Sequence, residues 1–197
     1  MKIKTAILGI SLLVISAGVA NAQGAWLGVN AGAGIPSGNY GDAASTGWNA
    51  GVTGTIMVND RWGVGGDLGY HSWGGSDQLN SAMETLYGSG SEFKWSAIQA
   101  TGHTMFRFPT TGNVKPYARV GAGLYDIKGK LSSPSGDVDN SKAKLGFNFG
   151  AGVQIPTGSN RMWGVTATYH VISAEKDFGS NVDAFSLGIN MMWGVGR

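Results

Sequence analysis

The chain has 197 residues, enough for one domain, and only 13% of them are charged, whereas soluble domains carry roughly 25%. Its 14 basic residues include Lys2 and Lys4 of the first segment, so 12 remain beyond it against 12 acidic residues. A formally neutral mature chain has no basic surface with which to bind nucleic acid. Glycine is abundant at 34 residues and cysteine is absent, so the fold does without disulfide bonds.

Residues 1–22 have the pattern of a secretory signal peptide. A charged start precedes a mostly apolar run over residues 6–19, and Ala20-Asn21-Ala22 has the small-x-small form of a cleavage site. A membrane anchor is the alternative, but the run is shorter than the ~20 residues of a spanning helix and is interrupted by glycine and serine. We predict cleavage after Ala22 and a single exported domain over residues 23–197.

Beyond the predicted signal, alternate residues of successive segments separate into an apolar face and a face of glycine and polar residues. These segments cover residues 25–35, 47–58, 62–73, 94–108, 114–126, 142–155, 162–172 and 184–193. No remaining run is suited to a membrane helix, and a membrane protein without such helices has to be a closed barrel. The predicted fold class is all-β, an eight-stranded antiparallel up-and-down transmembrane β-barrel.

The clearest strand is residues 114–126. One face carries Pro116, Ala118, Val120, Ala122 and Leu124, and the other carries Tyr117, Arg119, Gly121, Gly123 and Tyr125. Glycine inside a strand weakens it, but it leaves room where side chains converge in a narrow lumen. We interpret the apolar face as lipid-facing and the glycine face as inward.

The predicted connections alternate between long and short, as in outer-membrane barrels with long outer loops and short periplasmic turns. The long connections are residues 36–46, 74–93, 127–141 and 173–181, and the short ones are 59–61, 109–113 and 156–161. A short helix is expected over residues 77–87. An even number of strands places both termini on the short-turn side, which we predict to be the periplasm.

Aromatic residues gather near the predicted strand ends and charges avoid the middle of the apolar faces. The aromatic set is Trp62, Phe106, Phe108, Trp163 and Trp193 on the turn side and Trp48 and Tyr70 on the loop side. Asp126, Asp183 and Lys94 share the apolar parity, but each lies at a loop-side end. This distribution indicates two interfacial girdles; ordinary aromatic use in strands is the alternative.

Two segments carry a family resemblance. Residues 115–125, KPYARVGAGLY, and residues 146–153, GFNFGAGV, resemble segments of small outer-membrane β-barrel proteins, the eight-stranded class of the OmpA transmembrane domain, OmpX and the opacity-type proteins. The resemblance extends over essentially the whole mature chain and implies an architecture, not an activity. The chain departs from the family at its C-terminus: members usually end on an aromatic residue that the assembly machinery reads, whereas Trp193 is followed here by four residues.

The inward faces hold most of the candidate functional residues. The titratable set is Asp67, His71, His103, Arg107, Arg119, Lys144 and His170. Asp67 and Arg119 lie at similar distances from the short turns, so we predict that they form an ion pair, because an isolated buried charge is costly. The alternative is that each stays hydrated and unpaired. A structural plug is favoured over an ion or proton path.

Catalysis needs a nucleophile and a base on one surface, and the sequence offers no such pair. The His–Ser candidates are His71 with Ser72 and His170 with Ser173, each on opposite strand faces, and the acidic Glu175 and Asp177 lie on a loop near the second. None matches the His-x-Ser arrangement of lipid A deacylases. Scattered histidines without cysteine argue against a metal site, and glycines within strands cradle no phosphate. We predict no catalytic, cofactor-binding or metal-binding residues, and no cofactor.

The predicted function is that of a non-enzymatic outer-membrane barrel. It would stabilise the membrane, or it would bind surfaces, ligands or host molecules through its loops in an adhesion-type role. The expected partners are outer-membrane lipid and lipopolysaccharide, with an extracellular ligand held by loops 74–93 and 127–141, since variable tips on a rigid scaffold often bind. We expect a monomer. The alternatives are a lipid-modifying enzyme, a small-solute pore and a soluble exported barrel with an apolar interior.

Overall fold

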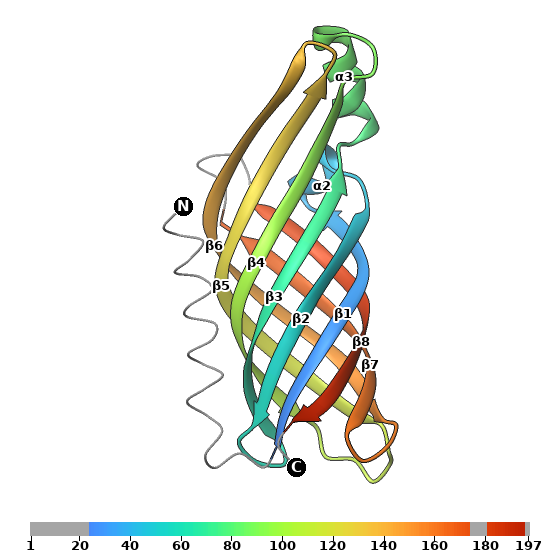
Figure 1. The fold of residues 1–197 in the computed structure, drawn as a ribbon, viewed down its shortest axis with the longest axis vertical. Coiled ribbons are helices and arrows are strands. Elements are labelled where there is room, and N and C mark those ends of the chain that lie inside the picture. Colours follow the sequence, from blue (N-terminus) through green and yellow to red (C-terminus); the bar gives the residue numbers. More distant parts are fainter. Residues whose placement is uncertain (1–23, 174–180, 196–197) are drawn as a thin grey trace.

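The computed structural model describes residues 24–173 and 181–195, which form a closed barrel (Figure 1). Its strands are β1 (Gly24–Ser37), β2 (Gly47–Met57), β3 (Trp62–Gly74), β4 (Glu92–Arg107), β5 (Lys115–Ser133), β6 (Gly136–Pro156), β7 (Arg161–Ile172) and β8 (Val182–Val195). Each pairs antiparallel with the next, and β8 closes the wall against β1. The predicted eight-stranded up-and-down barrel is confirmed. The predicted signal peptide lies outside the described residues.

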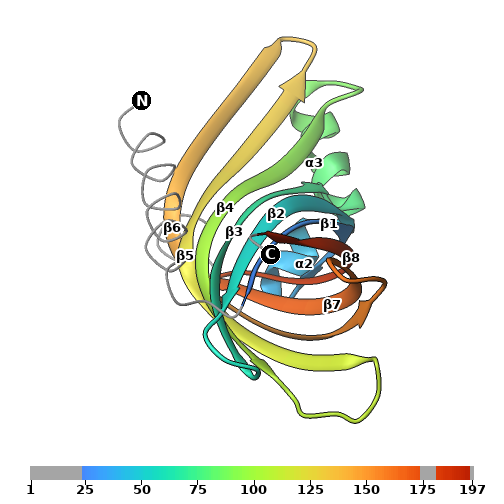
Figure 2. The ribbon, with the colours of Figure 1, turned by 60° about the horizontal axis from the view of Figure 1, so that its bottom comes forward.

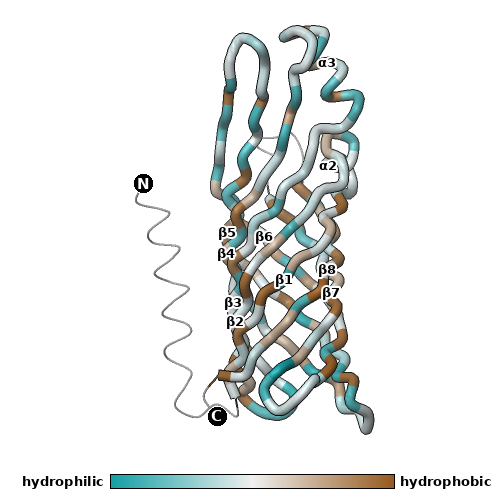
Figure 3. Tube along the Cα trace, turned by 45° about the vertical axis from the view of Figure 1, so that its right-hand side comes forward, coloured by the Kyte–Doolittle hydropathy of each residue, from teal (hydrophilic) through white to brown (hydrophobic). Residues whose placement is uncertain are grey.

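The apolar faces of the strands point outward. Val120 is 61% exposed, Phe149 54% and Leu187 49%, whereas the adjacent Asn148 is only 2% exposed and lies in the lumen. Figure 3 shows the resulting alternation of hydrophobic and hydrophilic positions along the strands. A soluble barrel with an apolar interior would have the opposite arrangement, so the lipid-facing interpretation is the one that agrees with the structure.

The two ends of the barrel differ. The turn end carries the connections 58–61, 108–114 and 157–160, together with Gly24, which pairs with Met57. The loop end carries helices α2 (Asn39–Ala43) and α3 (Asp77–Tyr87), of which α3 confirms the expected helix. The Ser76 hydroxyl caps α3 by accepting a hydrogen bond from the Leu79 amide at 3.3 Å. Within the described residues, neither helix has the length and apolarity to cross a bilayer.

One predicted loop is wrong. Residues 127–141 were expected to be irregular, but β5 continues to Ser133 and β6 begins at Gly136, so only two residues form the turn. The hairpin projects beyond the ring of strands (Figure 2), since β7 pairs with β6 only from Gly146 onward. Cross-strand ion pairs Lys128–Asp139 and Lys130–Asp137 join its strands. Proline, glycine and serine in this stretch serve a single tight turn.

The outward aromatics lie where the sequence predicted. At the turn end the rings of Trp62 and Phe106 are 4.8 Å apart, and Phe106 meets Phe108 at 5.2 Å. At the loop end Trp48 and Tyr70 are 5.5 Å apart. The pairs therefore flank the apolar band of the outer surface from both ends, as interfacial girdles do.

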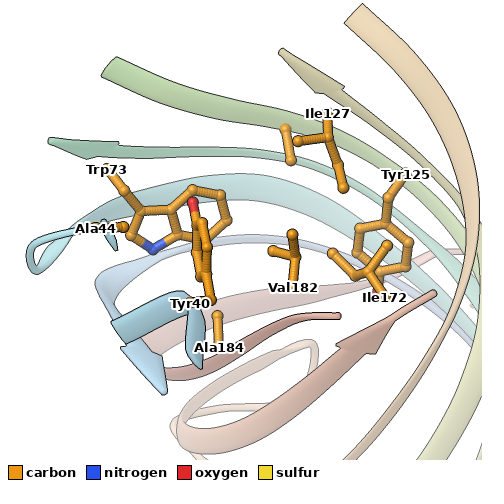
Figure 4. Packing of buried hydrophobic residues seen from close by; sticks show 9 residues of the cluster. Tyr40, Ala44, Trp73, Tyr125, Ile127, Ile172, Val182 and Ala184 are labelled. Atoms are coloured by element: carbon orange, nitrogen blue, oxygen red, sulfur yellow. The ribbon is translucent and has the colours of Figure 1, made fainter. Parts of the chain in front are cut away.

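The loop end of the lumen is filled by an apolar cluster, called the mouth cluster below (Figure 4). Its buried members are Tyr40, Ala44, Trp73, Ala97, Tyr125, Ile127, Ile172, Val182 and Ala184, with Trp95 packed against them. Tyr40 belongs to α2, within residues 36–46, which the sequence predicts only as a long connection. Its ring instead meets Trp73 and Trp95 edge-on, each at 5.7 Å between ring centroids.

Candidate functional site in the barrel lumen

Asp67 is the centre of the polar lumen. The side chain projects from β3, and its carboxylate accepts from the Arg119 guanidinium of β5, from His103 Nδ1 of β4 at 2.9 Å and from the Thr101 hydroxyl at 3.4 Å. The predicted ion pair between Asp67 and Arg119 is confirmed. His103 Nε2 lies 3.1 Å from the Thr55 hydroxyl of β2. A carboxylate removed from bulk water thus has charged and neutral donors on several strands, as a buried charge requires.

A second hydrogen-bonded group lies closer to the loop end. The Tyr125 hydroxyl is 3.0 Å from His170 Nδ1 and accepts from Asn148 Nδ2 at 3.2 Å. The rings of His71 and His170 meet edge-on at 5.1 Å, and His71 Nε2 lies 2.9 Å from Gln99 Oε1. Gln99 in turn donates to Thr101 Oγ1 at 2.8 Å, so this group continues into the one around Asp67.

A third group lies toward the turn end. Arg107 donates to Gln154 Oε1 at 2.9 Å, and Gln154 Nε2 donates to the Met192 sulfur at 3.3 Å. Nearby, Asn190 donates to the Thr166 hydroxyl at 2.8 Å, and Thr166 also bonds with Tyr117. Met57, Met105 and Tyr117 form a small apolar cluster there with Trp26 against them. Side chains from β1, β2 and β4 to β8 thus pack and form hydrogen bonds across the turn end of the lumen.

A cavity of about 100 Å³ remains between these groups. Most of the residues that line it are of polar type, among them Asn30, Asp67, His71, Arg119 and Ser186. Three atoms of the lining residues, His71 Nδ1, Arg119 Nε and Ser186 Oγ, have no hydrogen-bond partner among the described residues. We refer to this space as the central chamber.

The predicted inward set is brought together only in part. Arg119, His103 and Asp67 meet, and His71 meets His170, but Arg107 belongs to the turn-end group. Lys144 pairs in register with Tyr125 at the loop end of β6 and is half-buried.

The His–Ser candidates do not form pairs. His71 and His170 are buried in the lumen, Ser72 lies on the opposite parity of β3 and Ser173 is exposed beyond β7. The acidic candidates Glu175 and Asp177 lie outside the described residues. A Thr55–His103–Asp67 line has the connectivity of a nucleophile, base and orienter, but Thr55 is buried at 4% exposure and Arg119 already occupies the carboxylate.

No metal site emerges either. Among residues 24–173 and 181–195, no group of three or more His, Asp or Glu side chains is placed to hold an ion. What the arrangement supports chemically is hydrogen bonding that satisfies charge inside a narrow lumen. Sequence reasoning missed the neutral partners Thr55, Gln99 and Asn148, although their inward parity could have identified them.

Comparison with known proteins agrees with this architecture. A family model described as "Outer membrane protein beta-barrel domain" matches residues 7–193. A search of curated proteins finds no match.

Several solved structures are similar over most of their length. Neisserial surface protein A (NspA) has 17% identity and a TM-score of 0.58, covering 86% of this chain and 96% of that one. A major outer membrane protein from Thermus thermophilus has 14% identity and a TM-score of 0.55, covering 87% and 99%. OprG from Pseudomonas aeruginosa has 12% identity and a TM-score of 0.50, covering 90% and 98%. At these identities the likeness concerns the fold.

Proposed function

Because the chain belongs to the outer membrane protein β-barrel family, we propose that it is a non-enzymatic, monomeric barrel that supports the outer membrane and presents its loop end to the cell exterior. The turn end then faces the periplasm, and the lipid-facing band contacts lipopolysaccharide and phospholipid. The observation that carries the proposal is that hydrogen-bonded side chains occupy the lumen, while the β5–β6 hairpin and α3 project from the loop end.

The lumen supports a structural role in preference to a pore. Arg119 and His103 both bond to the Asp67 carboxylate inside it, and the mouth cluster fills the loop end with apolar side chains. An eight-stranded barrel has an interior just wide enough for its own side chains. Purified protein in planar bilayers should therefore show no steady conductance; sustained ohmic current would favour the pore.

The loop end supports a binding role. The β5–β6 hairpin and α3 project from a rigid wall, and rigid scaffolds with projecting tips commonly carry recognition surfaces. Val138 on the hairpin is 68% exposed, and Leu86 and Tyr87 at the end of α3 are also exposed. Apolar side chains exposed above the lipid-facing band suit contact with another surface.

One experiment separates the two roles. A variant in which residues 128–141 are replaced by a two-residue turn keeps every β6–β7 pair and removes β5 only opposite residues 92–96, at the loop-side end of β4. Cells carrying it should keep the detergent and antibiotic resistance of cells with the intact protein but adhere less to collagen-coated and bare plastic surfaces. Unchanged adhesion with unchanged resistance would remove the binding role of the hairpin and leave the structural one.

Localisation and processing have direct tests. Membrane fractions should contain the protein in a form whose gel mobility changes on boiling, as folded barrels do, and the mature N-terminus should begin at Gln23. Recovery from the periplasm without detergent would contradict the membrane assignment. Incubation with lipopolysaccharide, followed by mass spectrometry, should leave the acyl chains unchanged; altered chains would support the lipid-modifying enzyme instead.

A further inference from the structure

The central chamber lies directly beneath the mouth cluster. On four strands, a residue that lines the chamber has a residue of the mouth cluster two positions farther along the strand toward the loop end. The pairs are His71 with Trp73, Gln99 with Ala97, His170 with Ile172 and Ser186 with Ala184. Alternate residues share one face of a strand, so the cluster separates the chamber from the loop end.

The chamber has room and hydrogen-bonding atoms for water or a small ion. It has a volume of about 100 Å³, and the unpartnered His71 Nδ1 and Ser186 Oγ belong to side chains that are 5% and 8% exposed. Buried polar atoms without partners are normally satisfied by water or an ion. Water or ions that exchange with the exterior would pass either the mouth cluster or the turn-end side chains.

Tyr40 is the member of the mouth cluster suited to move. Its hydroxyl is buried without a hydrogen-bond partner, whereas Ile127, Ile172 and Val182 have no polar atom to leave unsatisfied. Exposure to water would satisfy the hydroxyl. Trp73 Nε1, against which Tyr40 packs, is likewise unpartnered, so displacement of Tyr40 would hydrate two polar groups together.

The helix that carries Tyr40 lies outside the strand ladders of the wall and packs against β1 and β8. α2 has only five residues, and its far side is anchored by two backbone hydrogen bonds, from Ser76 N to Ala43 O at 3.0 Å and from Ser45 N to Gly74 O at 2.9 Å. On its near side Gly38 has φ +57°, a conformation that glycine adopts freely. An outward swing of α2 would break the two backbone hydrogen bonds and leave the strand pairing of the wall intact.

We propose that α2 is a lid, with Tyr40 as its stopper, that opens to admit water and small polar solutes or ions into the central chamber from the loop end. Closed, the lid buries Tyr40 against Trp73 and Trp95. Open, it exposes the chamber wall formed by His71, Gln99 and Ser186 to the exterior. The chamber is then a gated compartment inside a barrel that does not conduct steadily.

The test uses the absence of cysteine from the chain. Ser186→Cys places a single thiol in the chamber wall, and its rate of reaction with 2-aminoethyl methanethiosulfonate is followed by mass spectrometry on the folded protein. Adding Tyr40→Ala should raise that rate roughly tenfold or more, because a buried aromatic side chain is removed. The matched control, Tyr70→Ala, truncates the same residue type on the outer face of β3, where the side chain is 41% exposed, and should leave the rate near that of Ser186→Cys alone.

A crosslink supplies the converse test. A Cβ at Gly74 would lie 4.0 Å from the Ser45 Cβ, within the range for a disulfide, so Ser45→Cys with Gly74→Cys pins the end of the α2 segment to β3. The crosslinked protein should label at Cys-substituted position 186 at least several-fold more slowly than the uncrosslinked one.

Two results would overturn the lid: equal acceleration by Tyr40→Ala and Tyr70→Ala, or a labelling rate that the crosslink does not change. Boiling-dependent gel mobility checks that each variant is folded. If Tyr40→Ala fails that check, the crosslink alone decides.

Discussion

Arg119 of β5 reaches past β4 to form an ion pair with Asp67 of β3 inside the barrel. The two residues are not cross-strand partners: Asp67 lies opposite Thr101, whereas Arg119 lies opposite Met105. The stagger of the intervening strand brings them together, and Thr101 and His103 of that strand also reach the same carboxylate. The pair therefore links three adjacent strands through one buried charge.

Breaking this pair should cost far more than breaking an exposed one. Asp67→Asn leaves Arg119 buried without a counter-charge, and we expect the free energy of unfolding to fall by about 3–5 kcal/mol. Adding Arg119→Met should return about 1–3 kcal/mol, because the uncompensated cation is removed as well. Urea unfolding in lipid vesicles measures both.

The exposed pair Glu92–Lys94 is the matched control, with side chains 59% and 64% exposed. Lys94→Gln should change stability by about 1 kcal/mol or less. If Asp67→Asn had a similarly small effect, water in the lumen would be screening the Asp67–Arg119 pair.

The lipid-facing assignment can be tested with two positions of similar exposure. Val120, at 61%, lies on the barrel wall, whereas Val138, at 68%, lies on the projecting hairpin. Val120→Arg should destabilise the folded barrel in vesicles by about 2–4 kcal/mol, since the charge enters hydrocarbon. Val138→Arg should be nearly neutral. Equal effects at both positions would place Val120 in water.

Inward glycines should differ from outward ones in their tolerance of alanine. A Cβ at Gly123 would lie 2.2 Å from the Ala100 carbonyl oxygen, whereas one at Gly102 would meet nothing nearer than 3.8 Å. Gly123→Ala should thus lower folded yield and unfolding free energy, because backbone atoms would have to shift.

Gly102→Ala should be neutral or stabilising by about 0.5–1 kcal/mol, since alanine has less freedom to lose. Folded fractions on unboiled gels and vesicle unfolding compare the two. If neither alanine substitution lowered the folded fraction or the unfolding free energy, the backbone around Gly123 would be able to shift to make room for a Cβ.

The projecting hairpin should loosen in acid. Lys130 donates a hydrogen bond to Asp137 and lowers the pKa of its carboxyl, helped by Ser132. A lowered folded-state pKa stabilises the hairpin above the ordinary Asp value of about 3.9 and loses that effect as pH falls through the lower value. Amide protection factors near the turn should therefore drop below about pH 4, while those of the barrel wall stay constant.

The contact between Lys130 and Asp137 should also weaken at alkaline pH, when Lys130 loses its proton. The hydrogen bond with Asp137 raises the pKa of Lys130, so its contribution persists below the ordinary lysine value and disappears as pH rises through the raised one. Asp137→Asn should abolish the acid response of the hairpin. A variant that still loosened in acid would assign the effect to other carboxylates, such as Asp139.

Sequence reasoning was weakest at the loop end. Residues 127–141 contain proline, serine and glycine and were predicted to be a loop, yet the alternation of Ile127, Gly129 and Leu131 against Lys128 and Lys130 continues through them. The Ser-Ser-Pro-Ser-Gly-Asp run at residues 132–137 indicates a turn, but it occupies only the tip of the hairpin, and the strand pattern continues up to it on both sides. The short α2 helix was missed for a related reason, since five residues carry too little periodicity to be recognised.

The amino-acid sequence by itself determined the strands, the outward direction of their apolar faces and the set of residues that enter the lumen, because a period of two is a local property of each strand. Only the tertiary structure decided which inward residues meet. The stagger of strands around a closed barrel sets the offset between Asp67 and Arg119, and the width of the mouth decides that Tyr40 fills it. The stagger of the strands and the width of the mouth both depend on how all the strands pack together, so neither can be predicted from a single strand.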